Sequence, residues 1–198
     1  MNSKNQKIQE DFLLDCGRIF IRGEIDEDSE EKFTNSLRYL VSKNNKTIYV
    51  YINSEGGDID SACAIIDEIN GAKSQGFSVT TISLGKSYSA AAYILTFGTK
   101  RYATENSTIM LHPILFDLDM DYIANQKAYT AFTDFKYADI IKKVANNCSK
   151  KTKVAIQGFV EKIQHGLWLS PKEAKKLKVI DGIWDYSLEK SIDENSNG

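Results

Sequence analysis

Two histidines are the side chains in this sequence best suited to acid–base chemistry near neutral pH. His112 and His165 are the only histidines in the chain, and imidazole is the usual proton acceptor near pH 7. His112 ends a predicted strand (109–112), where side chains reach the rim of an α/β sheet. A hydrogen bond to a nearby loop is the alternative role for His112. His165 lies in a predicted loop between a helix and a strand, and we expect it on the solvent-exposed surface.

Ser89 is the serine whose place in the sequence best suits a nucleophile. It follows a predicted strand (78–84) and precedes an alanine-rich segment that predicts a buried helix. A hydroxyl at such a turn points out of the sheet beside helix amides. Serine is also a common helix N-cap, and the local spacing fits both roles equally. Ser87 has the same ambiguity and a less favourable position earlier in the loop.

Gly56 and Gly57 follow another predicted strand (47–52) and precede a helix. Backbone amides without Cβ atoms suit an oxyanion or a closely approaching peptide, although a tight turn explains the pair equally well. The phosphate-binding glycine patterns are absent. Asp117, Asp119 and Asp121 lack the glycine and closing glutamate of a calcium loop, so a solvated acidic loop is expected and no metal site is predicted.

Strands that alternate with helices must position these residues. Runs rich in β-branched and aromatic residues predict strands at 18–22, 47–52 and 78–84, followed by shorter ones near 101–103, 108–111 and 179–184. Helical spacing of apolar residues follows the first two strands, with Ser29 as a possible cap of the first helix. A long helix is expected at 122–145, with a stripe that permits close helix approach: Ala124, Ala128, Ala131, Phe135, Ala138 and Ile141. The alternation predicts the α/β class with largely parallel strands.

Length and composition indicate one globular domain. The chain has 198 residues, of which 42% are hydrophobic and 26% charged, with only 2 prolines and 12 glycines. This composition excludes a fibrous chain or long disorder. Lys and Arg (25) nearly balance Asp and Glu (27), for a net charge of −2, so neither nucleic acid nor an anionic membrane is an expected partner.

The polar ends predict a flexible segment at 1–11 and a disordered tail at 187–198, around a domain spanning 12–186. No apolar stretch is long enough for a transmembrane helix or a secretory signal, which favours a cytoplasmic location. The three cysteines form no disulfide or zinc pattern and are expected to be free thiols.

Three segments in order, 49–57, 85–92 and 107–113, resemble the proteolytic subunit of the Clp protease, a serine peptidase of the crotonase-like fold. The similarity covers roughly residues 12–185. It implies repeated β-β-α units with a long protruding handle helix at 122–145. It also implies Ser89 as nucleophile, His112 as general base, and the amides of Gly57 and Ala90 as the oxyanion hole. No cofactor is implied.

One position departs from the family pattern. The third triad residue of the family is an Asp four residues before a Ser-x-x-Glu-Ala segment, and Gly166 occupies that place here. Glycine cannot orient or charge-stabilise an imidazolium. Three interpretations follow: a Ser89–His112 dyad with weakened turnover, a substitute acid, or an inactive structural subunit. The candidates for a substitute acid are Asp117, Asp119 and Glu161.

The resemblance also implies partners. Stacked heptameric rings would form a tetradecamer, and an AAA+ unfoldase would deliver unfolded polypeptides. Tyr49 and Tyr51 match the family's unfoldase-docking tyrosines, although their alternation by itself indicates only an aromatic strand face. The expected function is therefore an endopeptidase of a self-compartmentalising protease. Alternatives are an impaired ring subunit, a phage-type capsid-maturation peptidase of the same fold and, with least support, an acyl-thioester enzyme.

Overall fold

The computed structural model describes residues 10–113, 123–148 and 153–188. Its strands form one sheet with the order β1-β2-β3-β4-β7, and β5 and β6 extend from β3. All pairings are parallel except that of β5 with β6. The α/β class is confirmed. The strands are β1 (Arg18–Ile25), β2 (Thr47–Gly57), β3 (Ser78–Tyr88), β4 (Lys100–Ala103), β5 (Thr108–Leu111), β6 (Leu167–Leu169) and β7 (Gly182–Ile183).

The strand β3 is longer than predicted and divides between two neighbours. Its first half pairs with β4 through Thr80 to Ser83, and its second half pairs with β5 through Lys86 to Tyr88. Gly85, at φ +86°, lies between the two halves. The sequence suggested that the strand stops at this glycine, but the pairing with β5 continues it up to the residue before Ser89.

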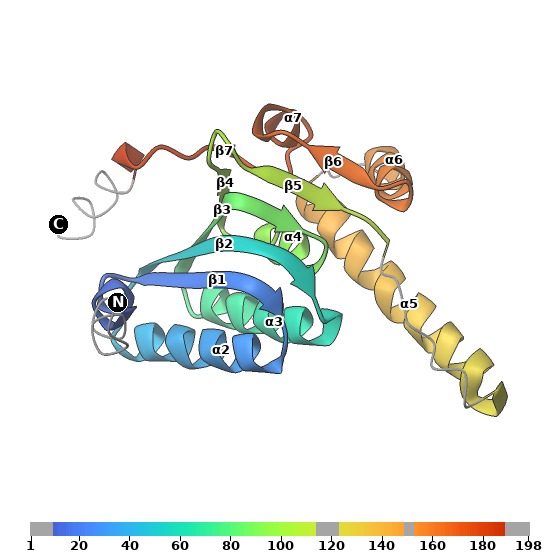
Figure 1. Cartoon of the computed structure of the whole chain (residues 1–198), viewed down its shortest axis with the longest axis horizontal. Coiled ribbons are helices and arrows are strands. Elements are labelled where there is room, and N and C mark those ends of the chain that lie inside the picture. Colours follow the sequence, from blue (N-terminus) through green and yellow to red (C-terminus); the bar gives the residue numbers. More distant parts are fainter. Residues whose placement is uncertain (1–9, 114–122, 149–152, 189–198) are drawn as a thin grey trace.

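The helices are α2 (Glu27–Ser42), α3 (Ile59–Ser74), α4 (Ala90–Leu95), α5 (Ile123–Cys148), α6 (Lys153–Gln164) and α7 (Pro171–Lys176). Of these, α2, α3 and α4 lie along one face of the sheet, whereas α6 and α7 lie beside β6 (Figure 1). The cap of α2 is Asp26, not Ser29: Asp26 accepts from the Ser29 amide at 2.8 Å, and Ser29 Oγ accepts from the Asp26 amide at 2.9 Å. The two residues form a reciprocal capping box, so the helix begins earlier than predicted.

The two faces of the sheet are both apolar but differ in kind. Alternate residues of β2 and β3, such as Val50, Ile52 and Val79, are buried with the helices. The opposite side carries a second cluster, which we call the aromatic face: Tyr49, Tyr51, Ile82 and Trp184. Phe20 stacks on Tyr51 with ring centroids 5.1 Å apart. The period-2 alternation of strands thus accounts for both layers.

The long helix α5 extends well beyond the sheet, as the handle of the predicted fold does (Figure 1). Its C-terminal part packs on the core through Ile141 and Val144, whereas Phe135 is 76% exposed and Ala138 is also exposed. The predicted stripe is therefore split, with Ile141 on the core side. The side chains of Ala124, Ala128 and Ala131 lie outside the described set. Within the described ranges, no helix is long and apolar enough to cross a membrane.

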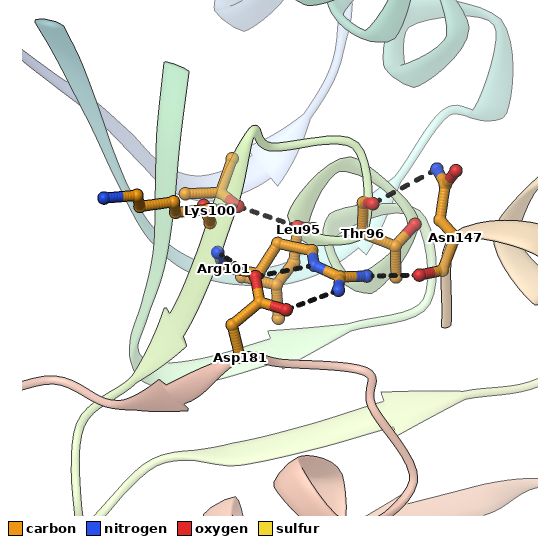
Figure 2. Close-up of polar contacts among 7 residues, drawn as sticks. Leu95, Thr96, Lys100, Arg101, Asn147 and Asp181 are labelled. Carbon is orange, nitrogen blue, oxygen red and sulfur yellow. Dashed lines mark hydrogen bonds and ion pairs between the residues drawn. The ribbon is translucent and has the colours of Figure 1, made fainter. Parts of the chain in front are cut away.

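The short helix α4 is held at its C-terminal end by polar contacts (Figure 2). Thr81 Oγ1 donates to the Leu95 carbonyl at 2.7 Å, and Asn147 of α5 donates to the Thr96 carbonyl at 3.2 Å. Arg101 in turn donates to the Asn147 carbonyl and forms a two-bond ion pair with Asp181. This network fixes α4 against α5 and the loop before β7, so the opposite end of α4, where Ser89 lies, is fixed as well.

Candidate active site

Ser89 lies between β3 and α4, with its backbone at φ 53° and ψ −123°. This conformation is uncommon for a residue with a side chain and stores local strain. The hydroxyl makes no capping hydrogen bond to the helix. Instead, Ser89 Oγ lies 2.7 Å from Nε2 of His112. Ser89 therefore occupies the N-cap position of α4, but its side chain does not cap the helix and is turned toward an imidazole.

His112 follows the last residue of β5, at the carboxyl end of the strand as predicted. The neighbouring turn is tied to the same strand, because the Ser89 amide donates to the Met110 carbonyl at 2.8 Å. Tyr88 and Met110 are also register partners in the parallel pairing of β3 with β5. The approach of Ser89 and His112, which are 23 residues apart in sequence, thus follows from the pairing of two strands.

Gly56 and Gly57 are the last two residues of β2, which is longer than predicted, and Gly56 lies against the turn that carries Ser89. A Cβ on Gly56 would come within 2.9 Å of Ser89 Cβ and 3.1 Å of the Ala90 nitrogen, so only glycine fits this approach. The Gly56 amide donates to Ser54 Oγ at 3.0 Å and is already used. Gly57 packs against the backbone of Ile25 in β1, whose carbonyl oxygen would lie 2.3 Å from a Cβ there; its role beside Ala90 stays a prediction.

Gly166 directly precedes β6, the strand that pairs with β5. Strands β5 and β6 pair Ile109 with Leu169 and Leu111 with Leu167, and one further step of this antiparallel register places Gly166 across from His112. The backbone of Gly166 is at φ +76°, and a Cβ there would have no atom within 4 Å. The position that carries an Asp in the resembled family therefore continues the register toward His112, and the space around it is open.

Of the candidate substitute acids, Glu161 is the one within the described residues. Glu161 is exposed on α6, and its carboxylate accepts from Gln157 at 3.4 Å. Asp117 and Asp119 lie outside the described residues. Within the part of the chain that the structure describes, the side-chain partner given for the His112 imidazole is Ser89.

The other predicted site residues differ in how far they are exposed to solvent. Ser87 is fully buried, and its hydroxyl donates to Ser83 Oγ at 2.8 Å, which leaves it inaccessible to a substrate. His165 is exposed, as predicted. Tyr49 and Tyr51 are 1% and 3% exposed in the aromatic face, so these docking candidates lie beneath the surface of the single chain.

Two contacts around the dyad had no clear signal in the sequence. The Tyr93 hydroxyl of α4 donates to the His112 carbonyl. Lys86 of β3 and Glu55 of β2 form an ion pair at 2.8 Å. The hydrogen bond from Lys86 lowers the pKa of the Glu55 carboxyl. Helical position and residue type alone do not indicate such partners, because each contact joins segments distant in sequence.

This arrangement has the parts needed for attack on a carbonyl. Serine is a weak nucleophile until a base takes its proton, and Ser89 and His112 are at the distance that this transfer requires. Gly56 of β2 and the amide nitrogen of Ala90, the first residue of α4, lie beside the serine, and backbone amides near a nucleophile can stabilise an oxyanion. The geometry therefore suits acyl transfer from an ester or amide.

Comparison with known proteins gives the same class. The family model for Clp protease matches residues 2–187. The chain is 30% identical over 172 residues to a protein from Streptomyces avermitilis named "ATP-dependent Clp protease proteolytic subunit 3", covering 83% of this chain and 73% of that protein.

Proposed function

Because this chain belongs to the Clp protease family, we propose that it is a serine endopeptidase that cleaves unfolded polypeptides through a Ser89–His112 dyad. The observation that carries the proposal is the 2.7 Å contact between Ser89 Oγ and His112 Nε2. A serine that served only to cap α4 would direct its hydroxyl to the helix amides, and Ser89 does not do so.

The reaction proceeds by proton transfer and covalent catalysis. His112 Nε2 takes the hydroxyl proton as Ser89 Oγ bonds to the scissile carbonyl carbon. The amides of Gly57 and Ala90 donate to the oxyanion that forms. The imidazolium then gives its proton to the leaving amine as the C–N bond breaks, and water hydrolyses the resulting acyl-enzyme with His112 again as base. These steps need no metal or organic cofactor.

Turnover by this dyad is expected to be slower than by a triad. A carboxylate beside the imidazole would fix its orientation and stabilise its charged form. Gly166 has no side chain to do either, and its position opposite His112 is open. This opening also supports a second candidate function, a catalytically impaired subunit that assembles with an active paralogue and contributes to the walls of the chamber.

The assembly is part of the proposal. Self-association into heptameric rings and a stacked tetradecamer would use the handle α5, whose Phe135 is exposed. An AAA+ unfoldase of the Clp type would dock near the aromatic face. Because Tyr49 and Tyr51 are buried there, contact would begin at the partly buried residues around them, such as Phe20 and Tyr102. A stable complex with a purified unfoldase is expected, and failure with several candidate unfoldases would remove this partner.

The peptidase activity is tested with an unfolded, fluorescently labelled polypeptide and a short fluorogenic peptide, while native mass spectrometry reports the particle mass. The wild type should cleave both slowly, and Ser89→Ala and His112→Ala should abolish cleavage without changing the particle mass. Equal cleavage by wild type and Ser89→Ala would overturn the proposal. No cleavage by a correctly assembled ring would favour the impaired subunit.

A further inference from the structure

Tyr93 contacts both residues of the dyad through the protein backbone. It is fully buried on α4, one helical turn after Ser89. Its amide donates to the Ser89 carbonyl at 3.2 Å, and its hydroxyl donates to the His112 carbonyl. The backbone of Tyr93 thus lies in the helix turn that begins at Ser89, and its side chain reaches the strand end that carries the imidazole.

The His112 carbonyl depends on this contact. Strand β5 ends at Leu111, and the pairing with β6 ends at the same residue, so the sheet no longer holds the backbone at His112. The Tyr93 hydroxyl supplies the donor that this carbonyl needs when it is partly withdrawn from water. Burial raises the pKa of Tyr93 far above its usual value, which keeps the phenol a neutral donor across the working pH range.

We propose that Tyr93 is a positioning residue that holds His112 at hydrogen-bonding distance from Ser89 in a site that has no orienting carboxylate at Gly166. This inference rests on the proposed function, since it assigns a role within the same dyad. In a triad, the carboxylate fixes the imidazole from one side. Here the fixed backbone of His112 takes over part of that task, because it limits the positions that the imidazole can reach.

The element that carries Tyr93 is rigid enough for this role. All six residues of α4 are buried, and its C-terminal end is held by Thr81 and Asn147 (Figure 2). The hydroxyl of Tyr93 is thus presented from a fixed helix. If the donor were on a mobile loop, the backbone at His112 could move together with that loop.

The test compares Tyr93→Phe, which removes only the hydroxyl, with Tyr39→Phe as a matched control. Tyr39 also loses a hydroxyl hydrogen bond, to Asp15 at 2.6 Å on the far helix α2. Fluorophosphonate labelling of Ser89 is timed in the full-length protein, with particle mass and thermal unfolding as checks. Tyr93→Phe should slow labelling by roughly tenfold or more, as small displacements of catalytic groups do, and Tyr39→Phe should not. Peptide hydrolysis should lose kcat with KM unchanged.

A double-mutant cycle separates positioning from general damage. If Tyr93 acts through His112, adding Tyr93→Phe to His112→Ala should not slow the residual labelling further. An equal loss in both backgrounds would overturn the proposal, because the effect would then not depend on the imidazole. Labelling of Tyr93→Phe at the wild-type rate would overturn it as well.

A measurement that needs no activity distinguishes this inference from the proposed function. The chain has two histidines, so ¹³Cε1-histidine labelling gives two NMR resonances, and His165→Asn identifies that of His112. In the Ser89→Ala background, Tyr93→Phe should shift or broaden the His112 resonance, and an unchanged resonance would overturn the positioning role. If the wild type is not labelled but this resonance responds, the peptidase proposal fails and the inference stands.

Discussion

Replacing Gly166 with Asp should strengthen the dyad by supplying a carboxylate next to His112. Directly opposed residues of an antiparallel pair have Cβ atoms about 4.5–5.5 Å apart, and the register of β5 with β6 places residue 166 opposite His112. From that distance, an Asp carboxylate reaches Nδ1 of the His112 imidazole, whose other nitrogen, Nε2, faces Ser89. The space at its Cβ is open to at least 4 Å, so no repacking is required.

The expected gain follows from the hydrogen bond that forms. A hydrogen bond to a charged group contributes about 1.5–3 kcal/mol, and about 1.4 kcal/mol corresponds to a tenfold change in rate. Because Gly166 is exposed, solvent screening favours the lower part of this range, about 1.5–2 kcal/mol, so we expect a gain of roughly 10- to 30-fold. The backbone at φ +76° would cost about 1–2 kcal/mol of stability for an ordinary residue, and less for Asp or Asn.

The assay is the second-order rate of fluorophosphonate labelling of the assembled particle, and Gly166→Asn is the matched control. Asn has the same shape and tolerates the same backbone conformation but has no charge. Asp should accelerate labelling and Asn should not, while both lower the melting temperature by similar amounts. Equal rates for the two variants, or no gain in a folded and assembled Gly166→Asp, would refute the reasoning.

Three further predictions concern the surrounding structure. Arg101→Lys should lose the two-bond pair with Asp181 and about 1–3 kcal/mol of stability in denaturant unfolding; an unchanged midpoint would contradict this. Asp58→Ala should remove the N-cap of α3, whose carboxylate accepts from the Ser61 amide at 2.6 Å, and lower the free energy of unfolding by about 1 kcal/mol. Fluorophosphonate labelling should also slow, because Gly57 precedes Asp58. Stability equal to that of the wild type would show that this cap does not stabilise the protein. Burial raises the pKa of Cys148 from 9.0 to about 12, so this thiol should resist alkylation at pH 8 until the protein unfolds. Its contribution to stability, fully present below pH 9, should fall as pH rises from 9 toward 12; alkylation of the native protein at Cys148 would contradict its burial.

Local signals in the sequence were sufficient for much of the fold. The β-branched run at 47–52 forms most of β2, and Ser170 and Glu173, spaced as a capping box requires, form one at the start of α7, with Glu173 Oε2 2.9 Å from the Ser170 amide. Prediction was weaker where the length of a strand depends on its pairing with a segment that is distant in sequence. The continuation of β3 past Gly85 depends on β5, and the predicted closing strand at 179–184 is reduced to Gly182–Ile183.

In the candidate site, too, local sequence signals predicted some features, whereas contacts between distant segments could not be predicted. Residue types and their places at strand ends identified Ser89 and His112, but the choice between nucleophile and cap depends on a contact across 23 residues. No local pattern could make that choice. Tyr93 was not identified either, because α4 is buried on all sides and its periodicity does not distinguish a packing side chain from one that donates to His112.

The most direct test of an activated Ser89 is the intact mass of the assembled protein after incubation with a fluorophosphonate probe. The dyad predicts a single adduct on the wild type, none on Ser89→Ala, and strongly slowed formation on His112→Ala. An assembled wild-type particle that forms no adduct, or an adduct that persists in Ser89→Ala, would contradict the account.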